Sequence, residues 1–180
     1  MGNRPPVVLV LASGRGERFL ASGGQGSKLQ AGLAGKTVLA HTLAAVRASG
    51  LPYHVEDAGH PGMGDSIAAG VRATAQAGGW LVLPGDLPLV QPASLRAVAE
   101  ALQRASLVLP LYRGIRGHPV GFAAEHGPAL QALRGAQGAA AIVRAAKPLQ
   151  LELDDEGIVT DIDTVDDLAR AERLLERRAS

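Results

Sequence analysis

A glycine-rich loop that follows an apolar segment contains the first residues whose types could do chemistry. The apolar run Val7–Leu11 leads into residues 13–28, a loop with five glycines, two arginines and a lysine. Glycine lets backbone N–H groups approach an anion, and the cations can neutralise the charge of that anion. The sequence therefore predicts a phosphate-binding loop. Its candidate residues are Ser13, Gly14, Arg15, Gly16, Arg18 and Lys28.

The loop differs from the two best-known nucleotide-binding loops. No Gly-Lys-Ser/Thr sequence opens the following helix, as a P-loop requires. Gly14 and Gly16 have no third glycine in register for a dinucleotide fingerprint, and no acidic residue ends a well-formed second strand. A flexible turn with solvated cations is the alternative interpretation.

A carboxylate follows a second apolar run. Trp80–Pro84 reads as a buried strand, and Asp86 comes two residues after it. Mg²⁺ prefers one or two carboxylates together with phosphate oxygens and water, so Asp86 is a candidate metal ligand. The alternative is that Asp86 caps the next helix. Pro92 fits the first turn of that helix, which makes Gln91 the better cap.

Three further groups have both a functional and a structural interpretation. Asp161 and Asp163 flank one residue, so strand alternation would turn one carboxylate toward the ligand edge as a second metal ligand. The same charges would also suit a helix N-terminus. Ser66 could hold a base or ribose, or could cap a helix. His118 lies in a loop, where a single histidine usually makes only local hydrogen bonds.

The elements that must position these residues alternate between strands and helices. This pattern predicts an α/β fold with a mostly parallel sheet covered on both faces. Ligands bind such sheets outside the carboxyl ends of the strands, which places the loops from Ser13 and from Gly85 at one edge. The expected strands are 7–12, 52–56, 80–84, 107–111, 119–123, 149–153 and 158–162. The expected helices begin at Thr37, Asp65 or Ser66, Pro92, Pro128, Ala139 and Thr164.

Length and composition restrict the class of protein. A chain of 180 residues with 47% hydrophobic and 19% charged residues fits one folded domain, residues 1–180. A net charge of +1 does not favour nucleic acid as a partner. No apolar run is long enough to span a membrane, and Met1–Pro6 does not resemble a signal peptide. The absence of cysteine removes thiolate chemistry and fits a cytoplasmic enzyme.

Five short motifs follow one another along the chain: Leu11-Ala-Ser-Gly-x-Gly-x-Arg18 with Lys28, Gly62-Met-Gly-x-Ser66, Gly85-Asp-x-Pro88, Arg116-Gly-His-Pro119 and Asp161-Ile-Asp-Thr164. In this order they resemble the MobA-like nucleotidyltransferases, and within them most closely the molybdenum cofactor cytidylyltransferases. The Gly-His-Pro and Asp-Ile-Asp-Thr sequences are more similar to the cytidylyl branch than to the guanylyl branch.

The resemblance implies a fold and a reaction. The fold would be the three-layer α/β/α sandwich of nucleotide-diphospho-sugar transferases, with a doubly wound sheet. The reaction would be Mg²⁺-dependent attack of the molybdopterin phosphate on the α-phosphate of CTP, with release of pyrophosphate. A homodimer and handover of the product to a molybdoenzyme or its chaperone would also fit. Leu11, Ala12 and Gly14 would contact nucleotide, Arg18 and Lys28 the triphosphate, and Asp86 and Asp163 the metal.

The chain departs from the family pattern in two places. Residues 20–27 separate Phe19 from Lys28, so Lys36 is an alternative phosphate-binding lysine. Only residues 51–61 stand where the family has a strand and a helix, which could expose a sheet edge that dimerisation covers. This shortening leaves two alternatives open. The protein could use another donor such as GTP or another phosphorylated acceptor, or it could be a non-catalytic nucleotide-binding protein.

Overall fold

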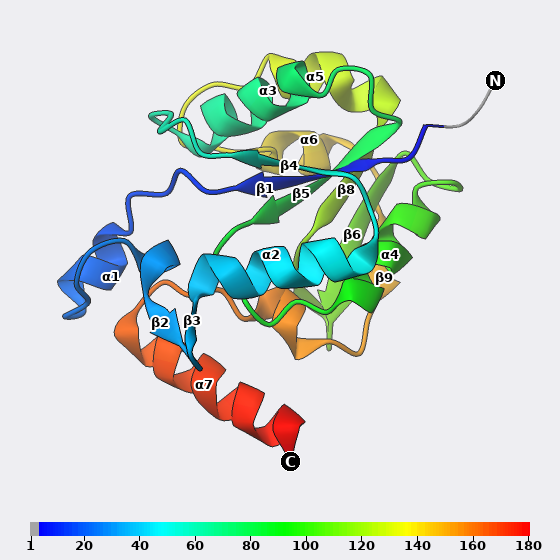
Figure 1. Ribbon diagram of the computed structural model, residues 1–180. Coiled ribbons are helices and arrows are strands. Elements are labelled where there is room, and N and C mark those ends of the chain that lie inside the picture. Colours follow the sequence, from blue (N-terminus) through cyan, green and yellow to red (C-terminus); the bar gives the residue numbers. More distant parts are fainter. Residues whose placement is uncertain (1–3) are drawn as a thin grey trace.

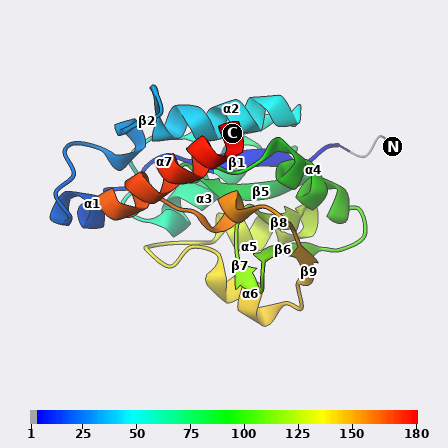
Figure 2. The same ribbon diagram turned by 90° about the horizontal axis from the view of Figure 1, so that it is seen from below.

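A seven-stranded sheet lies between two layers of helices (Figures 1 and 2). The computed structural model describes residues 4–180. Residues 1–3, the start of the segment Met1–Pro6 that does not resemble a signal peptide, lie outside the described part. The strands of the sheet are β1 (Val7–Leu11), β4 (Tyr53–Glu56), β5 (Gly79–Pro84), β6 (Leu107–Tyr112), β7 (Ile115–Arg116), β8 (Val120–Ala123) and β9 (Leu149–Glu152).

The helices and the remaining strands surround this sheet. Helices α3, α5 and α6 cover one face and helices α2 and α4 the other, as Figure 1 shows. A small hairpin of β2 (Gly32–Leu33) and β3 (Lys36–Thr37) precedes α2. The helices are α1 (Glu17–Ala21), α2 (Val38–Ser49), α3 (Met63–Ala73), α4 (Pro92–Ala101), α5 (Gly127–Gln131), α6 (Ala140–Ala145) and α7 (Val165–Ala179), with short 3₁₀ turns η1 (Lys28–Gln30), η2 (Ala124–His126) and η3 (Glu156–Val159).

The sheet is mixed, with the order β4-β1-β5-β8-β6-β7, and β9 pairs with β6. Strands β4, β1 and β5 run parallel, as do β6 and β9, whereas β8 and β7 run antiparallel to their neighbours. The predicted α/β class with a mostly parallel sheet is confirmed. Since β1 and β5 are adjacent and parallel, their carboxyl ends open on one edge, as the ligand-site prediction requires.

Alternating side chains of the central strands form two cores. Val8 and Val10 of β1 belong to the core under α2 and α4. Leu9 belongs to the core under α3 and α5, where Trp80 and Phe122 also lie. Period-two alternation explains this division, because successive side chains of a strand point to opposite faces. The rigid centre of the sheet therefore supports the loops that leave β1 and β5.

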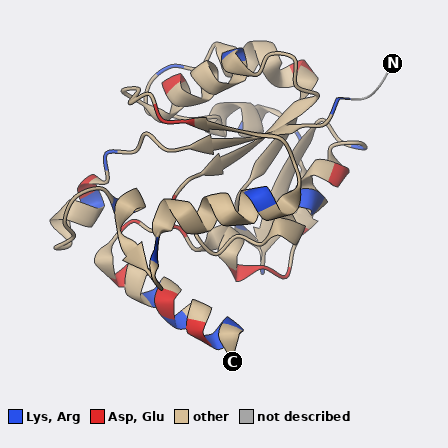
Figure 3. Ribbon diagram, in the orientation of Figure 1, with Lys and Arg blue, Asp and Glu red and all other residues tan. Residues whose placement is uncertain are grey.

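A third core fixes the C-terminal helix against the hairpin. Ala171 and Leu174 of α7 pack with Leu33 and Ile162. The other positions of α7 carry many charged residues of both signs (Figure 3). This packing brings residues 161–163, which directly precede α7, back toward the edge of the sheet where β5 ends. The backbone N–H of Ile162 donates to the Asp86 carbonyl at 2.9 Å, which fixes the two segments side by side.

Several helix ends follow the sequence signals. Thr37 caps α2 through a hydrogen bond from the Ala40 N–H, and Gly50 ends the helix with φ 75°. Pro92 occupies the first turn of α4, after Gln91. Thr164 forms the predicted capping box with α7.

Four local predictions are wrong. Residues 119–123 contain a central strand, β8, because Pro119 lies just before the ladder and blocks no hydrogen bond in it. Residues 158–162 form no strand, because the Asp155 carboxylate accepts from the Gly157 N–H and turns the chain into η3. Helix α3 begins at Met63, so neither Asp65 nor Ser66 caps it. The expected loop 13–28 contains the helix α1.

Strand β4 is an outer strand of the sheet. Its Tyr53 is a large apolar residue that is 42% exposed. This is the edge expected from the short segment 51–61, and dimerisation across it stays a prediction. In the described range 4–180, no helix has the length and apolar character needed to cross a bilayer.

Candidate active site

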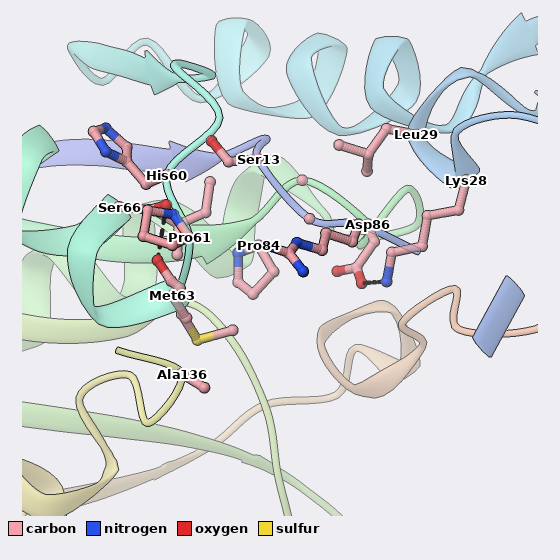
Figure 4. A pocket seen from close by; sticks show the side chains of 15 residues that line it. Ser13, Lys28, Leu29, His60, Pro61, Met63, Ser66, Pro84, Asp86 and Ala136 are labelled. Carbon is pink, nitrogen blue, oxygen red and sulfur yellow. Dashed lines mark hydrogen bonds and ion pairs between the residues drawn. The ribbon is translucent and has the colours of Figure 1, made fainter. Parts of the chain in front are cut away.

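A cleft of about 280 Å³ opens where β1 and β5 end. The loop after β1 forms one wall, and the start of α3 forms another (Figure 4). Gly85 lies at the floor, where an added Cβ would stand only 3.0 Å from the Leu11 carbonyl. The predicted residues that line this cleft are Leu11, Ser13, Gly14, Arg15, Lys28, Ser66 and Asp86.

Three carboxylates meet beside this cleft. One oxygen each of Asp86, Asp161 and Asp163 lies within 4.8 Å of the others. Asp86 follows β5, whereas the other two precede α7, so the third core brings them together. The sequence had favoured Asp86 and Asp163 as metal ligands, and Asp161 joins them because residues 160–163 form an irregular segment in which alternation does not apply.

Lys28 lies between two of these carboxylates. Its Nζ is 2.7 Å from Asp86 Oδ2 and 3.2 Å from Asp163 Oδ1. Figure 4 shows the Lys28 and Asp86 side chains pointing toward one another. Burial by itself would lower the pKa of Lys28, but the two carboxylates raise it above its ordinary value, so the ammonium stays charged. Lys36, the alternative lysine, is exposed on β3 and does not line the cleft.

The pKa values of the neighbouring carboxyl groups of Asp161 and Asp163 are shifted in opposite directions. Loss of water around the Asp161 carboxyl and its hydrogen bond with Asp163 raise the pKa of Asp161 to about 6. Burial opposes ionisation of Asp163 as well, but the hydrogen bond with Asp161 and the Lys28 charge lower the pKa of Asp163. The pair is therefore a concentrated acidic site, with Asp163 as its more ionised member.

The carboxylate set fits a small divalent cation. Asp86 Oδ1 is buried and has no hydrogen-bond partner within residues 4–180. A buried oxygen of this kind is costly unless a cation or a donor faces it. Hard oxygen ligands at this separation suit Mg²⁺ or Mn²⁺, which retain waters and bind phosphate oxygens as well.

The loop after β1 adds positive charge at the outer end of the cleft. A second hollow of about 390 Å³ is lined by Gly14, Arg15, Gly16, Arg18 and Lys28, together with Asp163. Gly16 has φ 63°, a left-handed conformation that glycine adopts without strain. The guanidinium of Arg18 lies 3.4 Å from Asp163 Oδ2, and its side chain is 79% exposed.

The remaining predicted residues, Ala12, Ser66 and His118, lie in different positions relative to the cleft. Ala12 does not line the cleft, and its backbone N–H donates to the Glu56 carbonyl. Ser66 lies in the cleft wall, where its hydroxyl donates to the Gly62 carbonyl at 3.2 Å. His118 lies outside this cleft and lines a neighbouring cavity. Burial lowers the pKa of His118, although the Asp86 charge opposes this.

The neighbouring cavity has a volume of about 510 Å³ and is mainly apolar. Val82, Val120 and Phe122 form part of its wall, and Arg116 and Arg144 also line it. It shares Leu11, Met63, Pro84 and Ala136 with the cleft, so the two spaces adjoin one another. The arrangement can hold a cation at the carboxylates and the apolar part of a ligand in the adjoining cavity.

Sequence reasoning missed some lining residues. His60 and Met63 line the cleft, and Arg144 lines the apolar cavity. The Gly62-Met-Gly motif could have indicated both residues, because Met63 belongs to the motif and His60 lies two residues before it. Arg144 lies on a short helix in a chain rich in arginine, and nothing in its local sequence marks it.

The family model for the MobA-like NTP transferase domain matches residues 44–151, more than half of the chain. The chain belongs to this family. The match includes Asp86 and His118, whereas Lys28 and Asp163 lie outside the matched range. The assignment confirms the resemblance found in the sequence motifs and shows the nucleotidyltransferase class. A search of curated proteins found no match.

Solved structures with the same fold come from bacteria and archaea. A nucleotidyl transferase from Methanothermobacter thermautotrophicus has a TM-score of 0.78 at 23% identity, covering 98% of this chain and 100% of that chain. The Rv0371C complex with manganese from Mycobacterium tuberculosis H37Rv has a TM-score of 0.73 at 23% identity, covering 94% and 98%.

A molybdopterin-guanine dinucleotide biosynthesis protein A from Archaeoglobus fulgidus also has this fold. Its TM-score is 0.68 at 19% identity, and the match covers 94% of this chain and 98% of that chain. At these identities the three likenesses show the fold alone.

Proposed function

We propose that the protein transfers CMP from CTP to the phosphate of molybdopterin carrying molybdenum and releases pyrophosphate. The observation that supports this most strongly is the meeting of Lys28, Asp86 and Asp163 at the carboxyl ends of β1 and β5. Nucleotidyl transfer joins two anionic reactants, so it needs charge neutralisation and alignment more than acid–base catalysis. The site offers both within a few ångströms.

The protein's cations would bind the donor triphosphate. Gly14 and Gly16 allow backbone approach to phosphate, while Arg15 and Arg18 line the outer hollow. Lys28 supplies a permanent positive charge beside the carboxylates. Leu11 and Ser66 line the cleft in which the nucleoside would lie.

Asp86 and Asp163 would hold Mg²⁺, with Asp161 as a further ligand or as the hydrogen-bond partner of Asp163. When bound, Mg²⁺ would neutralise phosphate charge and polarise the α-phosphate. The manganese complex of the mycobacterial neighbour agrees with a divalent metal in this fold. Lys28 would then be available to phosphate oxygens. Since Lys28 and Asp163 come from opposite ends of the chain, residues 1–180 would act as one functional domain.

The acceptor would occupy the apolar cavity. Arg116 and Arg144 would attract its anionic groups, and Val120 and Phe122 would contact its apolar part. His118 also lines this cavity and would contact the acceptor. Because this cavity adjoins the cleft, the acceptor phosphate would lie next to Asp86.

A panel of nucleotides tests the donor. Thermal unfolding is measured with CTP, GTP, ATP or UTP, each with Mg²⁺. A ligand at about 100 times its dissociation constant adds about 2.7 kcal/mol to the free energy of unfolding, which raises the unfolding temperature measurably. We expect the largest shift with CTP. A larger shift with GTP would contradict the donor assignment, and no shift with any nucleotide would favour a protein without this activity.

A further inference from the structure

The segment after Arg18 is folded on its own aromatic residue. Phe19 is only 3% exposed, although most of its neighbours in the loop are exposed. The Gly24 N–H donates to the Phe19 carbonyl at 2.9 Å, and a Cβ on Gly24 would overlap the Phe19 ring. The phenyl ring therefore covers the Gly24 backbone, and the segment is a packed unit.

Ser22 joins this unit to the last helix. Its hydroxyl donates to the Phe19 carbonyl at 2.9 Å and accepts from the Val165 N–H at 3.0 Å. Val165 is the first residue of α7, and Figures 1 and 2 both show α1 beside the beginning of α7. The first N–H groups of a helix have no partner within the helix, so Ser22 completes the cap from outside.

The capping box of α7 leaves this donor for Ser22. The Asp167 carboxylate accepts from the N–H groups of Asp163 and Thr164, and Thr164 Oγ1 accepts from the Asp167 N–H. Ser22 therefore binds the same short turn that holds Asp163 in place. The inserted segment, residues 20–27, and the segment that carries Asp161 and Asp163 are therefore fixed to one another at this point.

Arg18 depends on this attachment. Its guanidinium lies 3.4 Å from Asp163 Oδ2, but its side chain is 79% exposed. An exposed ion pair contributes little by itself and holds a long side chain only weakly. The position of the Arg18 charge must therefore come from the backbone of α1, which the Ser22 contact fixes relative to Asp163.

We infer that Ser22 is a positioning residue, which holds α1 against the start of α7 so that Arg18 faces Asp163. Phe19 and Gly24 stiffen the segment between them. The insertion is then a support for the phosphate-binding side of the site. The inference rests on the proposed function, because it assigns Arg18 to the donor phosphates.

A measurement on the free protein tests the position of Arg18 directly. The side-chain Nε–Hε resonance of Arg18 is followed by ¹⁵N NMR in the wild type, Asp163→Asn, Ser22→Ala and Ser22→Thr. We expect Ser22→Ala to move the resonance in the same direction as Asp163→Asn, and Ser22→Thr to leave it near the wild-type position. An unchanged resonance in Ser22→Ala would overturn the inference, and this readout does not depend on any activity.

A double-mutant cycle tests the consequence for binding. We expect Ser22→Ala to weaken CTP binding with Mg²⁺ about fivefold, the scale of one lost hydrogen bond, and to have no further effect in an Arg18→Ala background. Ser22→Thr should restore binding. Leu20→Ala, a change in the same helix at a 49% exposed side chain, is the matched control.

The two proposals fail in different ways. A Ser22→Ala effect of equal size with and without Arg18 would contradict positioning through Arg18. A wild-type protein that binds no nucleoside triphosphate would contradict the proposed function, and the NMR comparison would still decide whether Ser22 places Arg18. Unfolding temperatures of all variants identify any that fail to fold.

Discussion

Lys28 and Asp86 form an ion pair with 2.7 Å between Nζ and Oδ2, across 58 positions of sequence. Lys28 follows the inserted segment of the first loop, and Asp86 follows β5. This contact shows that Lys28 reaches the cleft although residues 20–27 are inserted before it. The pair joins the proposed triphosphate side of the site to the proposed metal side.

The lysine assignment gives the first prediction. Lys28→Met removes a charge that faces two carboxylates, whereas Lys36→Met removes one from an exposed hairpin. Hydrogen bonds to charged groups contribute about 1.5–3 kcal/mol, so we expect Lys28→Met to lower kcat/KM about 10- to 100-fold. Lys36→Met should stay near the wild-type value in the same steady-state assay. The reverse order would assign the role to Lys36.

The second prediction concerns the carboxylate that the sequence did not select. Asp161→Asn keeps the shape of the side chain and removes the charge next to Asp163. Whether Asp161 binds the ion or orients Asp163, we expect about tenfold weaker Mn²⁺ binding, measured by calorimetry. Asp57→Asn, an exposed change outside the carboxylate cluster, is the control. Wild-type affinity in Asp161→Asn would limit the metal site to two carboxylates.

Stability supplies a third prediction, at a buried carboxylate away from the cleft. Asp155 is 3% exposed and accepts hydrogen bonds from the Gln91 N–H, the Ser94 hydroxyl and the Gly157 N–H. Asp155→Ala leaves these donors unpaired, so we expect a loss of about 3 kcal/mol in the free energy of unfolding by urea. The exposed neighbour change Asp154→Ala should cost under about 0.5 kcal/mol. Equal losses would mean that the buried network contributes little.

A fourth prediction concerns pH. Burial opposes ionisation of Glu56, but hydrogen bonds from His54 and His60 lower its pKa below the ordinary 4.5. The folded state therefore binds this proton less readily than the unfolded state. The resulting stability is fully present above pH 4.5 and is lost as the pH falls through the lower folded value.

Glu56→Gln should remove that part of the acid dependence. We expect the unfolding free energy of the variant to fall less steeply than that of the wild type below pH 4.5, and to be lower at pH 7. The exposed change Glu152→Gln serves as the control. Parallel pH curves for Glu56→Gln and the wild type would show that the histidine contacts do not stabilise the carboxylate.

Local patterns predicted the parts of the fold that depend on local chemistry. The apolar runs at Val7–Leu11 and Trp80–Pro84 became adjacent parallel strands, because a continuous apolar run fits a strand buried on both faces. Thr37 and Thr164 marked helix starts through their side-chain hydrogen bonds. The prediction that the loop after β1 and Asp86 lie at one edge of the sheet therefore agrees with the structure.

Local sequence patterns did not predict the features that depend on contacts between residues far apart in the chain. Residues 158–162 have a strand-like composition, but Asp155 and the packing of Ile162 under α7 fix them as an irregular segment. That segment brings Asp161 to Asp86, which no local pattern indicates. In the same way, no local pattern indicates that Phe19 is buried against Gly24, and only the three-dimensional structure shows this contact.

The most direct test of the central claim is the dependence of nucleotidyl transfer on Asp86. Pyrophosphate release is measured with CTP, Mg²⁺ and molybdenum-loaded molybdopterin, for the wild type, Asp86→Asn and the exposed control Asp154→Asn. We expect one pyrophosphate per cytidylylated acceptor in the wild type and the control. Asp86→Asn should lose at least about 100-fold in rate with an intact fold. Full turnover by Asp86→Asn, or no transfer by the wild type from any nucleotide, would contradict the proposed function.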